Sequence, residues 1–254
     1  LDLEPPPVSL PEDRQRQYGY SLFSARFGNI YTVHHLAQLA AEASGSIPII
    51  NISWKKKGRF YDSQRPSVEP RGLPRKEDIL LHRQEHLKIV KNLFETMDVF
   101  IFTLGLTEYW FNKNNGIIFP TAPGTIAGRY NKKNFDFELS SFTQIMEAFK
   151  RFQDQVLHIR GGRALKMILT VSPIPLTATA SEQHVLKAST ASKSILRAVA
   201  WELEKNDPNI DYFPSYEILN NPKLHSTGFE SNLRTARQEM IETAISHFLR
   251  EHQK

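Results

Sequence analysis

V-F-I-F-T-L-G-L-T-E-Y-W, residues 99–110, is the stretch around which the chain is organised. Its first five residues are apolar or β-branched, which is typical of a strand buried on both faces of a sheet. Gly105 follows, where the backbone can turn sharply or approach a ligand closely. Ligands bind beyond the carboxyl ends of strands in open α/β sheets, so Thr107 and Glu108 are candidate site residues. The alternative is an ordinary turn with a solvated glutamate.

Two more apolar stretches predict strands, at 165–171 (L-K-M-I-L-T-V) and 210–213. Residues with helical periodicity separate the three strands and follow the last one. Strands that alternate with long helices indicate an α/β fold, with a parallel sheet covered by helices on both faces. We therefore expect all three strands to run parallel. The expected helices cover 75–97, a segment from Ser140 or Ser141 to Gly161-Gly162, a segment around 195–203 that ends near 206–208, and one around 241–249.

The remaining segments give weaker signals. Thr32 is a plausible N-cap of a short helix, and 47–54 could be a strand. The prolines and turn residues of 59–71 and 111–130 predict irregular loops, the second long enough to fold over the end of the central strand. Four prolines within residues 1–11 predict an extended surface segment. We expect one domain over 1–254, with an extended segment at 1–17 and a core at about 18–250.

Composition narrows the class of protein. Hydrophobic residues make up 40% of the chain and charged residues 23%, as in ordinary globular proteins. No apolar run is long enough to span a membrane. The chain has no cysteine, which excludes disulfides and thiolate chemistry within these residues and suits a reducing compartment. We therefore expect a cytoplasmic protein. The net charge of +5 is scattered, and the K-K-K run at 55–57 is typical of a solvated loop, so no nucleic-acid partner is expected.

Sequence motifs for nucleotide cofactors and zinc hydrolysis are missing: G-x-G-x-x-G, G-K-[ST], H-E-x-x-H and G-x-S-x-G do not occur. We expect no cofactor and no metal. Polar turns follow all three predicted strands, at 105–108, 172–175 and 214–217. In a parallel sheet these turns share one edge, which favours a site there more than any single motif does.

Five stretches, in this order, resemble the GSCFA family, a bacterial group similar to the SGNH/GDSL esterases and acyltransferases. The resemblance extends from about Tyr18 to Leu233. It implies a flavodoxin-like, three-layer sheet and acyl-ester chemistry without a cofactor. The stretches are F-S-A-R-F-G-N-I-Y-T (23–32), T-L-G-L-T-E-Y-W (103–110), T-V-S-P-I-P-L-T (170–177), S-K-S-I-L-R (192–197) and Y-F-P-S-Y-E-I (212–218).

The resemblance also assigns roles. The family's G-S-C-F-A motif, with its presumed serine nucleophile, is absent and is expected just upstream of Leu1. Gly105-Leu-Thr-Glu108 resembles the G-x-N-D block of SGNH enzymes, with Thr107 in place of their oxyanion-binding asparagine. His225 lacks the aspartate three residues earlier that SGNH enzymes have, so His225 and His184 are rival candidates for the base. The implied catalytic residues are Thr107, Glu108, His184 and His225, and the implied substrate-binding residues are Asn29, Gly105, Trp110 and Ser172.

The remaining histidines predict no catalytic role. A lone histidine is more often structural than catalytic. His34 and His35 belong to a helix start, and five others sit in helical charge patterns that predict solvated side chains. These five are His82, His86, His158, His247 and His252.

The function implied is an SGNH-like esterase or O-acyltransferase that acts on an acylated bacterial carbohydrate or polysaccharide precursor. Its mechanism would be serine attack, a histidine base and an oxyanion hole that includes Thr107. The alternative is a non-catalytic carbohydrate-binding or scaffolding domain that has lost the triad. The sequence does not predict an oligomeric state.

The missing nucleophile segment has a structural consequence. In SGNH-like folds the strand of the nucleophile lies inside the sheet, so its loss leaves unpaired backbone groups on neighbouring strands. Each such group costs about 1–3 kcal/mol when buried, which a domain stable by about 5–15 kcal/mol could not absorb several times. We expect residues 1–254 alone not to form a stable active unit. An upstream segment, residues 1–21 or a partner would fill the gap.

Overall fold

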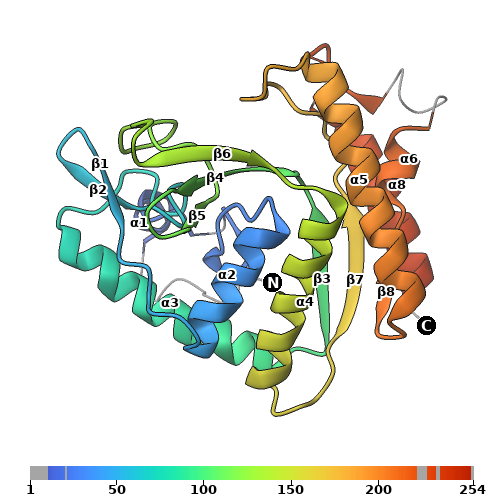
Figure 1. The fold of residues 1–254 in the computed structure, drawn as a ribbon, viewed down its shortest axis with the longest axis horizontal. Helices are drawn as coiled ribbons and strands as arrows, with labels where there is room; N and C mark the ends of the chain where they lie inside the picture. Colours follow the sequence, from blue (N-terminus) through green and yellow to red (C-terminus); the bar gives the residue numbers. More distant parts are fainter. Residues whose placement is uncertain (1–10, 21, 222–227, 233–234, 253–254) are drawn as a thin grey trace. The chain divides into compact units, whose positions relative to one another are not determined.

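The computed structural model describes residues 11–20, 22–221, 228–232 and 235–252. The chain divides into two compact units (Figure 1). The first unit contains residues 1–97 and 108–164, and the second contains 98–107 and 165–254. Both units mix helices with strands, so the chain has an α/β fold.

The second unit contains a three-stranded parallel sheet in the order β3-β7-β8. Its strands are β3 (Val99–Leu104), β7 (Lys166–Val171) and β8 (Ile210–Tyr212). The prediction of three parallel strands is therefore confirmed.

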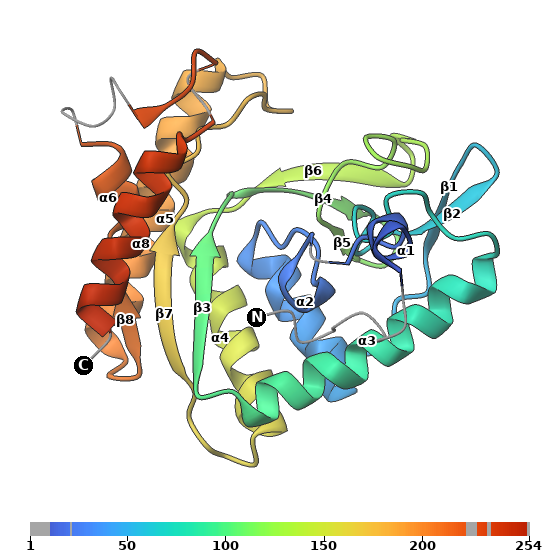
Figure 2. The same ribbon diagram turned by 180° about the vertical axis from the view of Figure 1, so that it is seen from behind.

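Helices cover both faces of β7 and β8. Helix α5 (Val185–Asn206) lies on the viewer's side of these strands in Figure 1. Helix α8 (Gln238–His252) lies on the opposite side, which faces the viewer in Figure 2. The short α6 (Ser215–Leu219) follows β8 directly. Phe213, just after β8, contacts Phe248 of α8 with ring centroids 5.1 Å apart, which joins this helix to the sheet. The predicted helices on both faces are present in this unit.

Strand β3 is not buried on both faces as expected. Val99 and Ile101 are 44% and 53% exposed, whereas Phe102 and Leu104 on the opposite face are buried. Among the described residues β3 pairs only with β7, so it is an edge strand. Successive side chains of a strand point to opposite faces, and here one face of β3 is left uncovered.

The first unit contains a β-hairpin and a separate three-stranded antiparallel sheet in the order β5-β4-β6. Helix α3 corresponds to the helix predicted at 75–97. The strands are β1 (Ser53–Lys56), β2 (Arg59–Asp62), β4 (Glu108–Asn112), β5 (Ile118–Phe119) and β6 (Phe135–Leu139), and the helices are α1 (Glu12–Gln17), the 3₁₀ helix η1 (Ser24–Arg26), α2 (Val33–Ser44), α3 (Lys76–Thr96) and α4 (Phe142–Ile159).

Three local predictions for this unit were wrong in part. The strand expected at 47–54 begins only at Ser53, and residues 59–62 of an expected loop form β2. Lys57 and Gly58 both have positive φ, as in a type I′ hairpin turn between β1 and β2. The first part of the long loop expected at 111–130 is a hairpin, because β4 pairs with β5 across the turn at 114–116, whereas 120–130 contain no helix or strand. Turn residues thus mark a hairpin at one end of each expected loop, and the rest of each loop, at 63–71 and 120–130, contains no helix or strand as predicted.

The predicted helix caps were correct. The hydroxyl of Thr32 accepts a hydrogen bond from the His35 N–H at 3.3 Å, which caps α2. Ser141 caps α4 by accepting from the Gln144 N–H, and the Gln144 side-chain oxygen accepts from the Ser141 N–H at 2.8 Å. This reciprocal capping box satisfies two N–H groups that the start of a helix otherwise leaves unpaired.

A buried ionic cluster links α2, β2 and α3 within the first unit. Arg83, 1% exposed, forms ion pairs with Glu42 and Asp62, and Arg65 also pairs with Asp62 at 3.3 Å. Burial by itself would raise the pKa of Asp62, but Arg83 and Arg65 outweigh it and hold that pKa below its ordinary value. The carboxylate of Asp62 is therefore charged at neutral pH and depends on its arginine partners.

His86 belongs to the same interior, and the prediction that it is solvated was wrong. Its side chain is buried, and burial is the main cause that lowers its pKa to about 2. Its Nε2 lies 3.1 Å from the carbonyl oxygen of Ala25, in a turn where Ala25 and Arg26 both have positive φ. Arg65 donates to the Arg26 carbonyl oxygen at 3.0 Å. Buried polar contacts thus hold this strained turn in place.

Candidate functional site

The carboxyl edge of the β3-β7-β8 sheet brings three polar turns together. The Ser172 N–H donates to the Leu104 carbonyl oxygen at 2.9 Å, which joins the turn after β7 to the end of β3. Ser215, just beyond β8, donates from its hydroxyl to the Val171 carbonyl oxygen at 3.1 Å and also contacts the hydroxyl of Thr170. This edge, where α/β folds bind ligands, is the candidate site.

The turn Gly105–Thr107 at this edge is held by two consecutive residues of α5. The ammonium of Lys193 donates to the Gly105 carbonyl oxygen at 3.0 Å, and the hydroxyl of Ser192 accepts from the Thr107 N–H at 3.3 Å. Thr107 itself is 3% exposed, and the described residues offer its hydroxyl no hydrogen-bond partner. The turn after β3 is therefore held at both ends by α5.

Lys193 has an unusual environment. Its side chain is only 4% exposed, and no carboxylate in the described ranges forms an ion pair with it. Burial lowers the pKa of the amine to about 8, because the charged form is poorly solvated there. An ammonium without a counter-ion in the interior costs stability, so its presence at the sheet edge suggests a functional reason.

The burial of Lys193 could have been inferred from its position on the apolar stripe of a helix, although not from the S-K-S-I-L-R stretch alone. Ser189, Ser192 and Lys193 are all buried and lie three and four residues apart, so they share one face of α5. The same face continues with the buried residues Leu196 and Val199. A lysine on the apolar stripe of a helix is the pattern that marks a buried amine.

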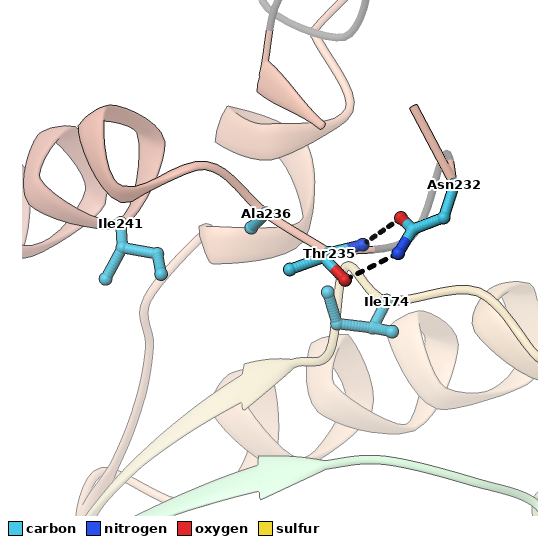
Figure 3. A pocket seen from close by; sticks show the side chains of 5 residues that line it. All are labelled: Ile174, Asn232, Thr235, Ala236 and Ile241. Carbon is cyan, nitrogen blue, oxygen red and sulfur yellow. Dashed lines mark hydrogen bonds between the residues drawn. The ribbon is translucent and has the colours of Figure 1, made fainter. Parts of the chain in front are cut away.

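A cavity of about 400 Å³ lies beside the turn that follows β7 (Figure 3). Three of its lining side chains are apolar, and the other two, Asn232 and Thr235, hydrogen bond to each other at 2.9 Å. The turn is fixed in part by Ser172, whose hydroxyl accepts from the Ile174 N–H at 3.3 Å. A small apolar group fits this lining, which consists of Ile174, Asn232, Thr235, Ala236 and Ile241.

Of the two candidate bases, only His184 lies within the described residues. His184 is the exposed N-cap of α5, and its Nδ1 accepts from the Leu186 N–H at 3.3 Å. In this arrangement Nε2 is the ring nitrogen that carries the proton, and Nδ1 must give up the cap to accept another. His225 lies outside the described residues. The assignment of a base therefore stays a prediction.

The remaining sequence candidates lie in the first unit. Glu108 is the first residue of β4 and pairs with Leu139 of β6. Trp110, in the middle of β4, packs its ring on Phe137 and Tyr130 with centroids 5.3 Å and 5.4 Å apart. Asn29 is half-buried in the loop after η1. The structure thus gathers Gly105, Thr107 and Ser172 on one sheet edge and places Asn29, Glu108 and Trp110 in the other unit.

Two features are absent from the described ranges. No three histidine, aspartate or glutamate side chains there are grouped so that they could hold a metal ion. None of the helices in those ranges combines the length and apolar character needed to cross a membrane.

Comparison with known proteins gives one match. The model of the GSCFA family matches residues 12–248, nearly the whole chain and both units. No curated protein and no solved structure shows significant similarity to the chain. The family match confirms the resemblance seen in the five ordered sequence stretches.

Proposed function

Because the chain belongs to the GSCFA family, we propose that it forms the core of an SGNH-like esterase or O-acyltransferase. The proposed substrate is an acylated bacterial carbohydrate or polysaccharide precursor. The observation that carries the proposal is the turn Gly105–Thr107 at the carboxyl edge of the parallel sheet. Buried groups of α5 fix this turn, and the hydroxyl of Thr107 has no partner among the described residues.

The proposed reaction is a two-step acyl transfer through serine. The serine oxygen attacks the ester carbonyl carbon while a base, His184 or His225, takes the serine proton. The carbonyl oxygen becomes an oxyanion, to which the Thr107 hydroxyl donates a hydrogen bond. When this intermediate collapses, the leaving alcohol receives the proton and the acyl group stays on the serine. Water or an acceptor hydroxyl then takes the acyl group by the reverse sequence.

The nucleophilic serine is proposed to come from a segment that adds a strand to β3. Two observations support this origin. On its open side β3 has no pairing strand within the described residues, and its residues Val99 and Ile101 are exposed on one face. A strand added next to β3 would end beside Gly105, because parallel strands share their carboxyl edge. Its serine would then reach the same edge as Thr107 and Ser172.

The cavity beside Ile174 supports acyl-group binding. Its volume of about 400 Å³ lies within the range of small-molecule sites, roughly 300–1,000 Å³. Its apolar side chains would favour a short acyl chain over a charged group. The lining also contains the polar pair Asn232 and Thr235, which would exchange a mutual hydrogen bond for one to the ester or the sugar.

One observation favours the second candidate, a non-catalytic carbohydrate-binding domain. Trp110, Tyr130 and Phe137 form an aromatic group in the first unit, and the Tyr130 side chain is 44% exposed. Aromatic faces are suited to packing against the apolar face of a sugar ring. Sugar binding that is lost in Trp110→Ala, in a protein without ester turnover, would select this candidate.

Replacement of Thr107 by valine in a protein that contains the upstream serine tests the proposed function. Valine keeps the shape of threonine and removes the hydroxyl, so the oxyanion loses one donor. We expect kcat for ester hydrolysis to fall about 100-fold or more, with a smaller change in KM, while Thr107→Ser retains most of the activity.

The matched control for this substitution is Thr103→Val, on the exposed face of β3 in the same strand-and-turn segment. It should leave kcat unchanged. Equal turnover of Thr107→Val and the unsubstituted protein would contradict the role of Thr107.

A further inference from the structure

The peptide group between Gly105 and Leu106 has an unusual set of contacts. Its carbonyl oxygen accepts from the buried ammonium of Lys193 at 3.0 Å. Its N–H, contributed by Leu106, makes no hydrogen bond within the described residues. All described peptide bonds are trans, so the C=O and N–H of this group point in opposite directions. The N–H therefore faces away from Lys193 as an available donor.

A cation on the carbonyl oxygen strengthens the donor at the other end of the same peptide. The ammonium draws electron density toward the oxygen, which makes the N–H more positive, and the low dielectric of the interior enhances the effect. Ser192 holds the next peptide by accepting from the Thr107 N–H. Together Ser192 and Lys193 fix the direction of the Leu106 N–H and strengthen it.

The contacts of Lys193 do not account for its burial through a gain in stability. Its single hydrogen bond among the described residues goes to a neutral carbonyl, and no charged side chain contributes to the shift of its pKa, which burial alone causes. The folded-state pKa lies below the usual value of 10.5, so the charged form is disfavoured by folding. Below pH 8 the amine is nevertheless protonated and reduces stability. Such a cost fits a residue retained for the site.

We propose that the Gly105–Leu106 peptide is an oxyanion donor of the acyl-transfer site, and that Lys193 is the positioning residue that orients and polarises it. This inference rests on the proposed function, and it names a donor besides the Thr107 hydroxyl. The Leu106 N–H donates to the oxyanion formed from the ester carbonyl, while the ammonium keeps its proton throughout. Lys193 thus acts through the peptide and does not touch the substrate.

Kinetics of Lys193 variants test the inference in the protein that carries the upstream serine. Lys193→Met should lower kcat about 10- to 100-fold, below the usual effect of removing a donor outright, with little change in KM. Its melting temperature should be equal or higher, because the buried charge is gone. Lys193→Arg keeps the charge and should restore part of the activity. Lys187→Met, at an exposed lysine of the same helix, is the matched control and should change neither quantity.

The pH profile adds a readout that a structural lysine would not give. The unsubstituted protein should lose activity as pH rises through about 8, where the ammonium of Lys193 deprotonates. The Lys193→Arg variant should not show this loss, since arginine stays charged. A Lys193→Met protein that melts at a lower temperature and keeps its kcat would overturn the inference, as would an identical alkaline limb in Lys193→Arg.

Nuclear magnetic resonance tests the same contact without any substrate. The carbonyl ¹³C signal of Gly105 should shift with an inflection near pH 8, and this inflection should be missing in Lys193→Met. A Gly105 signal that does not titrate, in a protein that hydrolyses esters, would refute the role of Lys193 alone. A titrating Gly105 signal in a protein with no ester turnover would instead refute the proposed function.

Discussion

Replacement of Arg83 by methionine is expected to lower the free energy of unfolding by about 3–5 kcal/mol, the usual cost of breaking a buried ion pair by removing one partner. Arg83 serves two carboxylates, those of Glu42 and Asp62, and all three side chains are buried. Methionine fills a similar volume but donates no hydrogen bond. Both carboxylates would then keep their burial and lose a counter-ion, and the measurement is urea unfolding followed by circular dichroism.

The matched control is Arg75→Met, at the residue that precedes the same helix. Arg75 pairs with Asp78, but its own side chain is 71% exposed, so solvent replaces the lost contact. The urea midpoint of this variant should stay close to that of the unsubstituted chain. An Arg83→Met protein that unfolds at the same urea concentration as Arg75→Met would show that the ionic cluster does not hold the first unit together.

A protein extended upstream by the segment proposed to add a strand and the serine nucleophile is expected to melt at a clearly higher temperature than residues 1–254 alone. The added strand would pair with the open edge of β3, and its side chains would pack beside Val99 and Ile101, which are exposed on one face of β3. A gain of about 1 kcal/mol raises the melting temperature of a 150–250-residue protein by about 2–4 °C. Several new hydrogen bonds and the apolar burial should therefore give a rise of about 5 °C or more.

Differential scanning calorimetry of the two proteins measures this rise. Equal melting temperatures with equally cooperative transitions would contradict the missing-strand argument. In that case a partner fills the edge of β3, or the edge needs no neighbour.

The parallel sheet could be predicted because its strands depend on strong local patterns. The apolar runs at 99–103, 165–171 and 210–213 are each followed by a polar turn and separated by long helices. Such runs become strands in almost any α/β arrangement, and the direction of the strands follows from the helices between them. The prediction that β3 is buried on both faces was wrong, because the pattern of apolar residues does not show which elements pack against a strand. Val99 and Ile101 look like core residues in the sequence and are exposed in the structure.

The antiparallel sheet of the first unit was missed for a different reason. Strands β4, β5 and β6 are short and lie among turn residues, such as Asn114-Asn115-Gly116, that also occur in irregular loops. The pairing of β4 with β6 joins residues 23 to 31 positions apart along the chain, and it depends on tertiary packing of aromatic side chains, including Trp110 and Phe137. Local sequence does not contain that information.

The position of the candidate site in the fold could be predicted from the sequence, but the buried side chains that hold its turns could not. Thr107 and Ser172 follow predicted strands, and the structure places both at the expected edge. Lys193 escaped because most helical lysines are solvated, and its contact with Gly105 joins residues 88 positions apart. His86 was misread in the same way, since a charged-looking helix can still bury one histidine. Burial of single polar residues is decided by the fold as a whole.

Reaction of the protein with a fluorophosphonate, followed by mass spectrometry and by hydrolysis of p-nitrophenyl acetate, tests the central claim most directly. That claim is that the carboxyl edge of the β3-β7-β8 sheet is an acyl-ester site served by a serine outside residues 1–254. The account predicts that the upstream-extended protein hydrolyses the ester and carries one phosphonate, on the added serine, whereas residues 1–254 alone do neither. No adduct and no hydrolysis in the extended protein, or equal hydrolysis by both proteins, would contradict it.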